Sequence, residues 1–287
     1  MRHEYALLDV FTDRRFGGNQ LAVFHDGWGV SDADMQAVAR ELNFSETVFI
    51  AKPEQGGDHK LRIFTPAREL PFAGHPTIGT AFFLADGKDA DLRLEEGVGT
   101  LTVTVTSGFV EMEQPAPTFG PELDAEKLFE DLRDAIGIAS VTAEPRPQVV
   151  SSGNPFLFVA VDPDEIADLS VNVSALNSLL TDVGAMGLYA FTDRRTALPD
   201  SRVHGRMFAP GAGVAEDPAT GSAAGPLAAY LVCHGMADPG ERIVIEQGFE
   251  MGRPSLMYAR VGGTKDRITT LHVGGRAVMS GGGWVEL

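Results

Sequence analysis

Short runs rich in Val, Phe, Thr and Tyr alternate along this chain with Gly, Pro and Asp, and this pattern predicts many short β-strands. We expect strands at residues 4–11, 21–26, 46–51, 61–66, 91–95, 100–106, 109–114, 147–152, 156–162, 187–192, 202–209, 242–247, 255–261 and 268–286. Apolar residues at helical spacing predict fewer helices. We expect helices at residues 31–42, 77–87, 123–136, 172–183 and 219–235. Each half of the chain therefore has many strands and its own Ala-rich central helix, which indicates an α+β fold.

One strand–turn–helix pattern occurs twice, about half the chain apart. The first copy spans residues 62–80 and the second spans residues 206–222. A shorter echo precedes each copy, with Gly-Asn at residues 18–19 and again at residues 153–154. Such a repeat predicts two similar lobes whose divergent residues face each other at one site. We therefore expect two pseudo-symmetric lobes, each a mixed β-sheet or barrel wrapped around its central helix.

The boundary between the lobes is predicted at residues 115–122, where three prolines interrupt the pattern. This gives an N-terminal lobe of residues 1–118 and a C-terminal lobe of residues 119–275. The Gly-rich tail joins two final short strands, and the pattern leaves open whether residues 276–287 return to complete the first lobe's sheet. The active site is expected in the cleft between the lobes.

Composition and charge exclude several kinds of partner. The chain has 287 residues and a formal net charge of −17, which disfavours nucleic-acid backbones and anionic membranes as partners. The acidity also fits a role in solubility alone. In either case an anionic substrate would need locally positive groups, such as helix N-termini, to bind against the overall field.

Cys233 is the only cysteine, so the sequence predicts neither a disulfide framework nor a thiolate zinc site. The histidines show no metal-ligand spacing, and we expect no metal. Residues 1–10 form a strand pattern without the core of a signal peptide, and no apolar run approaches the roughly 20 residues of a membrane helix. The expected compartment is the cytoplasm.

The two helix starts in the repeat are candidate anion sites. Pro76 and Pro218 stand where the fixed φ angle of proline favours the opening of a helix. Small residues follow at 77–81 and at 220–224, so the free backbone N–H groups of each helix start are open to approach. These donors and the helix dipole bind a carboxylate or an oxyanion. Helix capping with close packing explains either copy alone, but the pair together favours a binding site.

Two different titratable residues, His75 and Asp217, are predicted at matching places just before these helices. A histidine at a helix entrance can donate a hydrogen bond to a substrate near neutral pH. The aspartate can orient that imidazole or bind an amine. An ordinary turn histidine is the structural alternative for His75.

Glu46 is the candidate for proton transfer, because it stands where an apolar strand begins. Flanking Phe44, Val48 and Phe49 predict partial desolvation of its carboxylate. Burial raises the pKa of a carboxyl group and makes it a usable proton shuttle near neutral pH. A solvent-exposed acid at a strand edge is the alternative that its position alone would favour.

Several segments, in order over nearly the whole chain, resemble the PhzF-like family of phenazine-biosynthesis isomerases, which share the two-lobed diaminopimelate epimerase fold. The most specific are Gly-His-Pro-Thr at residues 74–77 and Glu-Asp-Pro-Ala-Thr-Gly-Ser at residues 216–222. The others are Asp-Val-Phe-Thr at 9–12, Gly-Asn at 18–19, Ser-Glu-Thr-Val-Phe at 45–49, Gly-Asn-Pro at 153–155, Gln-Gly at 247–248 and Gly-Arg-Pro-Ser at 252–255.

This resemblance implies a cofactor-free isomerase that acts on a small carboxylate and forms a homodimer. It implies that Glu46 is the general acid and base, that His75, Asp217 and Ser222 line the pocket, and that the backbone around Gly74 and Gly221 holds the substrate carboxylate. In the best-known family reaction, trans-2,3-dihydro-3-hydroxyanthranilate is isomerised. Such a carboxylate takes a proton from the ring carbon bearing the hydroxyl and returns it elsewhere on the conjugated system.

The resemblance also implies substrate-binding roles for Asn19, Asn154 and Thr220. One departure concerns the first of these, because family members commonly have Gly-Asn-Pro near the N-terminus, whereas Gln20 follows Asn19 here. The sequence does not decide whether Arg68 points into the pocket, nor whether Arg253 contacts substrate. It also leaves the substrate itself open.

Three other functions remain open at this point. A same-fold epimerase or racemase would use a thiol at each helix start, but His75 and Asp217 occupy those segments and Cys233 lies well downstream. Another proton-transfer reaction also fits the same groups. The third alternative is a non-catalytic binder of small carboxylates, and the presence of Glu46 and Ser222 beside the other candidates argues against it.

Overall fold

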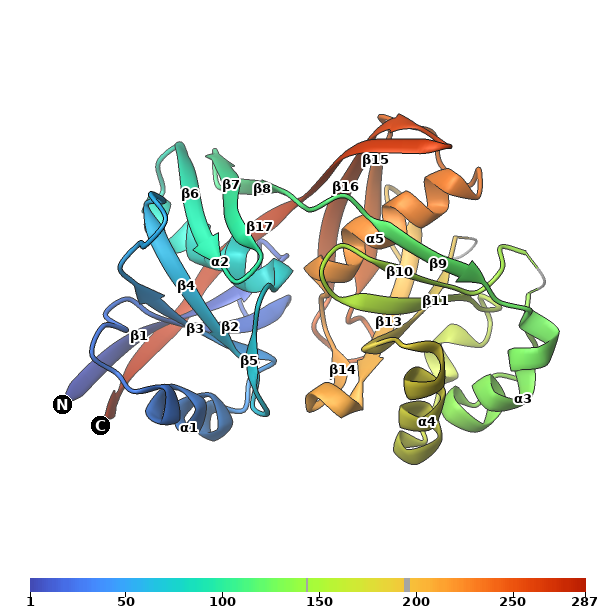
Figure 1. The fold of residues 1–287 in the computed structure, drawn as a ribbon, viewed down its shortest axis with the longest axis horizontal. Coiled ribbons are helices and arrows are strands. Elements are labelled where there is room, and N and C mark those ends of the chain that lie inside the picture. Colours follow the sequence, from blue (N-terminus) through green and yellow to red (C-terminus); the bar gives the residue numbers. More distant parts are fainter. Residues whose placement is uncertain (143, 194–196) are drawn as a thin grey trace.

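The computed structural model describes residues 1–142, 144–193 and 197–287. Its helices are α1 (Asp32–Leu42), α2 (Gly74–Ala85), α3 (Ala125–Ile136), α4 (Val173–Val183) and α5 (Gly221–Cys233), with short 3₁₀ turns η1 (Ile166–Asp168) and η2 (Pro210–Ala212). Its strands are β1 (Arg2–Val10), β2 (Asn19–Phe24), β3 (Glu46–Ala51), β4 (His59–Phe64), β5 (Glu69–Leu70), β6 (Ala90–Glu96), β7 (Gly99–Thr106), β8 (Phe109–Glu113), β9 (Thr118–Glu122), β10 (Gln148–Ser151), β11 (Pro155–Ala160), β12 (Gly187–Thr192), β13 (Val203–Ala209), β14 (Val214–Asp217), β15 (Arg242–Gln247), β16 (Ser255–Thr264) and β17 (Arg267–Glu286). The strands form two lobes side by side (Figure 1).

The first lobe is a closed barrel around a helix. Strands β1, β2, β3, β4, β6, β7, β8 and β17 pair in turn, and β17 pairs back with β1. Helix α2 lies inside and contacts most of these strands. Helix α1 packs on the outer side, where Met35, Val38 and Ala39 contact aromatic residues of the barrel wall. Closure leaves this barrel without free edges.

The second lobe repeats this plan with an open sheet. Strands β9, β10, β11, β12, β13, β15, β16 and β17 pair in that order. Helix α5 contacts β10, β11, β16 and β17 on one side of the sheet. Helices α3 and α4 pack together and cover β11, β12 and β13 with a separate apolar cluster. The expected mixed sheet around a central helix is thus present in both lobes.

The long strand β17 belongs to both lobes. Its first part pairs with β16, with Tyr258 opposite Gly274, and its last part pairs with β1, with Arg2 opposite Glu286. In Figure 1 it runs as the red ribbon from one lobe to the other and ends beside the N-terminus. We therefore propose that residues 276–287 complete the first lobe of residues 1–118, and that residues 119–275 form the second lobe.

The two central helices are buried on all sides, which explains their lack of a polar face. Residues 74–81 of α2 and residues 221–232 of α5 are all buried. A helix that is apolar all round belongs in a core or a membrane. Among the described residues, no helix is long and apolar enough to cross a membrane.

Every predicted strand and helix range is present, with ends that differ by at most three residues, but the two final short strands expected around the Gly-rich tail form the single long strand β17. The structure adds β5, β9 and β14, which the sequence pattern did not predict. Strand β9 falls inside the proline-containing boundary segment 115–122 and, among the strands that the structure describes, pairs with β10 alone. As an edge strand it tolerates Pro121, because a strand edge does not need every backbone N–H group. The boundary segment is therefore partly regular structure.

The two helix starts differ from the predicted ones. Helix α2 begins at Gly74, so His75 lies in its first turn rather than before it, and Pro76 occupies a position whose N–H group has no intrahelical partner. Helix α5 begins at Gly221, and Asp217 is the last residue of β14. The expectation that the two residues hold matching places before their helices is wrong, because the chain enters each helix differently.

Candidate active site

Glu46 is the first residue of β3, at the end of the first barrel that faces the second lobe. The β2–β3 pairing places it opposite Leu21 in a parallel register. Its side chain is only 13% exposed, and its Oε2 lies 3.4 Å from Nδ1 of His75. Among the described residues Oε2 has no hydrogen-bond partner. The carboxyl group therefore faces the interior with one oxygen left for another molecule.

His75 projects from the first turn of α2 and is almost fully buried. Its Nδ1 lies 3.1 Å from Nδ2 of Asn19. Its Nε2 has no hydrogen-bond partner in the described part of the chain. Burial lowers the pKa of His75 to about 3, against a smaller opposing contribution from the backbone of Gln20. The imidazole is therefore neutral, and its contact with Glu46 is not an ion pair.

Asp217, at the end of β14, is buried and surrounded by hydrogen-bond donors. Ser45 Oγ donates to Oδ1 at 2.9 Å and Thr220 Oγ1 donates to Oδ2 at 2.7 Å. Asn19 Nδ2 donates to Oδ1 at 2.8 Å. Three donors from both lobes thus converge on one carboxylate. Such bonds stabilise the charged form of a carboxyl group.

The amide of Asn19 joins the two lobes. Besides Asp217, its Nδ2 donates to the backbone oxygen of Ala219 at 2.9 Å. Both acceptors are oxygens, so the amide nitrogen rather than its oxygen must face them. Asn19 lies on the first lobe and its partners lie 198 and 200 positions along the chain. Asn19 therefore fixes the position of the Asp217 carboxylate relative to Glu46 and His75.

Near neutral pH, one of the carboxyl groups of Glu46 and Asp217 is protonated and the other is ionised. Burial, and then the negative charge of Asp217, raise the pKa of Glu46 well above its ordinary value. Burial also raises the pKa of Asp217, to about 6, while its hydrogen bonds from Thr220, Ser45 and Asn19 oppose that rise. Asp217 has these donors and Glu46 does not. Near neutral pH the negative charge therefore resides on Asp217 and the proton on Glu46.

The N-termini of α2 and α5 meet at the same place. A Cβ atom added to Gly74 would lie 2.4 Å from the carbonyl carbon of Gly221 and 2.5 Å from the nitrogen of Ser222. Neither helix has a side-chain cap. Their first N–H groups are therefore left for another acceptor, and both helix dipoles favour an anion at this point. This juxtaposition is what the repeated sequence pattern predicted.

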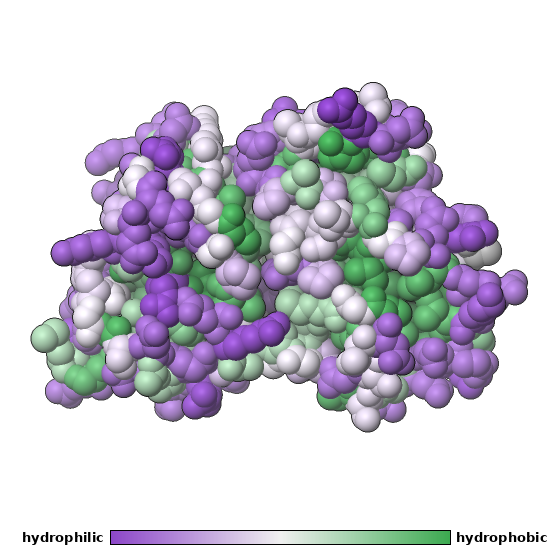
Figure 2. Space-filling view, in the orientation of Figure 1, coloured by the Kyte–Doolittle hydropathy of each residue, from purple (hydrophilic) through white to green (hydrophobic). Residues whose placement is uncertain are grey.

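A cavity of about 30 Å³ lies between these groups. It is lined by Glu46, Gly74, His75, Asn154, Asp217, Thr220, Gly221 and Ser222, together with apolar residues that include Phe156, Met186 and Met207. This volume accommodates little more than a water molecule. A ring-shaped substrate therefore enters only when the lobes move apart. Figure 2 shows the furrow between the two lobes from outside.

Of the residues singled out in the sequence, Asn19 does not line this cavity. It lies outside the cavity lining, next to Asp217, and its amide donates a hydrogen bond to that carboxylate rather than to a bound molecule. Arg253 binds Asp9 at 2.6 Å and the backbone oxygens of Gly17 and Gly18 at 2.7 Å, so its contacts are structural. Cys233 ends α5 and donates to the carbonyl of Lys265. The described cavity lining thus holds no thiol for a two-thiol epimerase.

Ser45 and Gln247 belong to the site but were not predicted as site residues. Gln247 Nε2 donates to the backbone oxygen of Asp217 at 2.6 Å, and Gln247 Oε1 accepts from Tyr189 at 2.9 Å. Both Ser45 and Gln247 stand within the segments that carry the family resemblance. That position is the signal that could have identified them.

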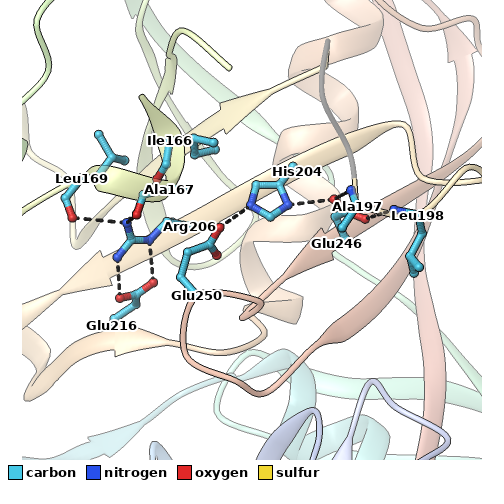
Figure 3. A network of polar contacts seen from close by, with 10 residues as sticks. All are labelled: Ile166, Ala167, Leu169, Ala197, Leu198, His204, Arg206, Glu216, Glu246 and Glu250. Carbon is cyan, nitrogen blue, oxygen red and sulfur yellow. Dashed lines mark hydrogen bonds and ion pairs between the residues drawn. The ribbon is translucent and has the colours of Figure 1, made fainter. Parts of the chain in front are cut away.

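A polar network lies on the side of β13, β14 and β15 opposite to the cavity (Figure 3). It holds in place the strands that carry Asp217 and Gln247. Successive side chains of a strand point to opposite faces, so Glu216 faces this network while its neighbour Asp217 faces the cavity. Its members are His204, Arg206, Glu216, Glu246 and Glu250, with backbone groups of residues 166, 167, 169, 197 and 198. Burial lowers the pKa of His204, but hydrogen bonds with Glu246 and Glu250 outweigh it and raise the value to about 9. His204 is therefore charged near neutral pH and ties both glutamates together.

Known proteins resemble this chain along its whole length. A family model described as phenazine biosynthesis-like protein matches residues 8–283. A trans-2,3-dihydro-3-hydroxyanthranilate isomerase from Pseudomonas chlororaphis is 40% identical over 294 aligned residues, which cover 99% of this chain and 100% of that protein.

Solved structures show the same fold. A PhzF-family phenazine biosynthesis protein from Bacillus anthracis superposes with a TM-score of 0.90 at 25% identity and covers 100% of both chains. A hydroxyproline epimerase from Agrobacterium vitis has a TM-score of 0.69 at 13% identity, with 99% of this chain and 91% of that chain covered. Identity that low shows the fold alone. The predicted two-lobed, diaminopimelate epimerase-like fold is confirmed.

Proposed function

This chain belongs to the phenazine biosynthesis-like family and is an isomerase, and we propose that it shifts a proton within a small cyclic carboxylate, with Glu46 as its single general acid and base. The observation that carries this proposal is the buried Glu46 carboxyl group, which faces a closed cavity between two uncapped helix starts. The isomerase from Pseudomonas chlororaphis suggests trans-2,3-dihydro-3-hydroxyanthranilate, or a molecule like it, as the substrate.

The proton shift needs one base that returns what it removes. In its ionised form Glu46 takes a proton from a carbon next to the conjugated system, so that a C–H bond breaks and an O–H bond forms. The electron pair of the broken bond moves the double bond along the system. The same Glu46 then protonates a distant carbon of that system, and the resulting enol tautomerises to a ketone. No proton is gained or lost overall.

The surroundings of Glu46 support this role. Because burial and Asp217 raise its pKa, its ionised form is a stronger base than an exposed carboxylate. The N–H groups at the starts of α2 and α5 hold the substrate carboxylate and disperse charge that develops during the shift. His75 Nε2 and Ser222 offer further polar contacts at the cavity wall. The closed cavity keeps water from exchanging the proton.

Turnover of trans-2,3-dihydro-3-hydroxyanthranilate in D₂O tests the proposal. NMR should show loss of the original double-bond pattern and formation of the ketone isomer. It should also show protium carried from the donor carbon to the acceptor carbon in a fraction of product, because the cavity shields Glu46. Failure to bind or convert this compound and other cyclic carboxylates would contradict the proposal.

Asp217→Asn is expected to move the acidic limb of the pH profile of kcat/KM to lower pH. The ionised form of Glu46 is the active one, so activity is lost as the pH falls through its pKa. The negative charge of Asp217 is one of the two causes that raise that pKa. Its removal therefore lowers the pKa of Glu46 and extends activity to more acidic solutions, with a weaker base and a lower plateau.

Asp131→Asn is the matched control, because Asp131 is an exposed residue of α3 and loses the same charge. Its profile should coincide with that of the unmodified enzyme. An acidic limb in Asp217→Asn that stays in place or moves to higher pH would show that Asp217 does not raise the pKa of Glu46.

A further inference from the structure

A second, larger cavity of about 580 Å³ adjoins the one that contains Glu46. The two share Leu70, Asn154, Met186 and Ala212 in their walls. The larger cavity lies between β5 of the first lobe and the end of α4 in the second. A molecule seated at Glu46 would reach the outer cavity past these four shared residues.

The walls of this outer cavity combine apolar and hydrogen-bonding groups. Leu70, Leu180 and Met186 supply apolar surface, while the amides of Asn154 and Asn177 supply polar groups. The Nδ2 of Asn154 is held by the carbonyl of Phe72 at 3.2 Å. This combination suits a ligand arm with a carbon stem and a polar end.

The described lining of the outer cavity has one positive and one negative side chain, although the chain as a whole carries −17. The charged residues in its described lining are Arg68 and Glu69. Glu69 is engaged by both Nε and Nη2 of Arg62, which also binds Asp32 at 3.0 Å, so Glu69 already has a cationic partner. In the described part of the chain no acid is placed in an ion pair with the guanidinium of Arg68. This arginine is therefore available to a ligand.

We propose that this outer cavity binds a second, anionic arm of the substrate and that Arg68 recognises it. The inference rests on the proposed function, because the first carboxylate must lie at the helix starts for the arm to point outward. The natural substrate then belongs to the class of cyclic compounds with two acidic groups, and trans-2,3-dihydro-3-hydroxyanthranilate, which has a single carboxylate, is a smaller analogue of it. A ring with a single carboxylate leaves the outer cavity unfilled and binds more weakly.

Isothermal titration calorimetry with five probes tests this assignment. The first three are benzoate, 3-(carboxymethoxy)benzoate and 3-(carbamoylmethoxy)benzoate, whose arm is a neutral amide. The other two carry the same acid or amide arm at ring position 4, so that the arm points in a second direction. For at least one direction we expect the dicarboxylate to bind about tenfold more tightly than its amide, as for a charge-assisted hydrogen bond. This ratio should fall towards one in Arg68→Gln and with added salt. In Arg68→Glu the amide should bind more tightly than the dicarboxylate.

Arg40→Gln is the matched control, since Arg40 is an exposed residue in the last turn of α1, outside both cavities, and loses the same charge. It should keep the ratio of the unmodified protein. Equal binding of acid and amide in both directions, or a ratio that survives Arg68→Gln, would overturn the role of Arg68 and leave the proposed isomerase unaffected. If none of the carboxylates binds, the carboxylate site itself is wrong, and the inference fails with it.

Discussion

Glu46→Gln is expected to lower kcat by about 10²–10⁴-fold, the contribution that one positioned acid–base group makes to a proton transfer. The glutamine side chain has the same shape as the protonated glutamic acid that the structure indicates near neutral pH. It fits the buried place beside His75 and leaves the cavity intact. Affinity for a substrate-like carboxylate should therefore persist. Only the ability to take and return a proton is lost.

The measurement pairs single-turnover kinetics with calorimetry on 3-hydroxyanthranilate, an aromatic analogue of the substrate of the Pseudomonas chlororaphis relative. Glu41→Gln serves as the control, because Glu41 is exposed near the end of α1 and undergoes the same substitution outside the site. Unchanged turnover in Glu46→Gln would remove Glu46 from the reaction. Loss of analogue binding along with turnover would instead indicate that the residue only shapes the cavity.

The chemistry of Glu46 could be predicted only in part from its neighbours in sequence. Flanking Phe44, Val48 and Phe49 indicated desolvation, and the side chain is nearly buried. The second cause of its raised pKa, the charge of Asp217, comes from the other lobe. No local pattern shows which carboxyl groups a fold brings together. Deciding which of the two holds the proton required the three hydrogen bonds to Asp217.

The strands and helices were predictable because hydrophobic periodicity and turn residues are local properties. Short elements such as β5 and β14 were missed, since a strand of two to four residues has too few positions to show a period. The contacts of Asn19 could not be predicted for a different reason. Its sequence position indicates a turn next to the site, but its amide acts on Asp217 and Ala219, which lie in the distant half of the chain.

The repeat predicted that two helix starts bind an anion together, and the structure adds how close they must come. Gly74 and Gly221 touch through their backbones, so the site exists only while both positions lack a side chain. Each lobe contributes only part of the donor set. If the two helix starts hold the substrate carboxylate as proposed, its binding is coupled to the closing of the lobes, because an open cleft would separate the two groups of N–H donors.

Gly74→Ala is consequently expected to lower kcat/KM by about 10²-fold or more. The new Cβ would lie 2.4 Å from the carbonyl carbon of Gly221 and 2.5 Å from the nitrogen of Ser222. Both contacts are with backbone, which cannot rotate away, so the two helix starts must separate. A displacement of about 1 Å at a reacting centre can cost this much in rate. Steady-state kinetics on trans-2,3-dihydro-3-hydroxyanthranilate measures the loss.

Gly281→Ala provides the control, because a Cβ there would meet only Leu7 Cδ2, at 3.9 Å, on the far part of β17. It should keep full activity. Far-UV circular dichroism and thermal unfolding separate a local displacement from a general loss of structure, since alanine is a better helix former than glycine in α2. If Gly74→Ala folds and turns over at the rate of the unmodified enzyme, contact between the helix starts is not required. In that case the substrate carboxylate must be held elsewhere, and the coupling of binding to closure must be abandoned.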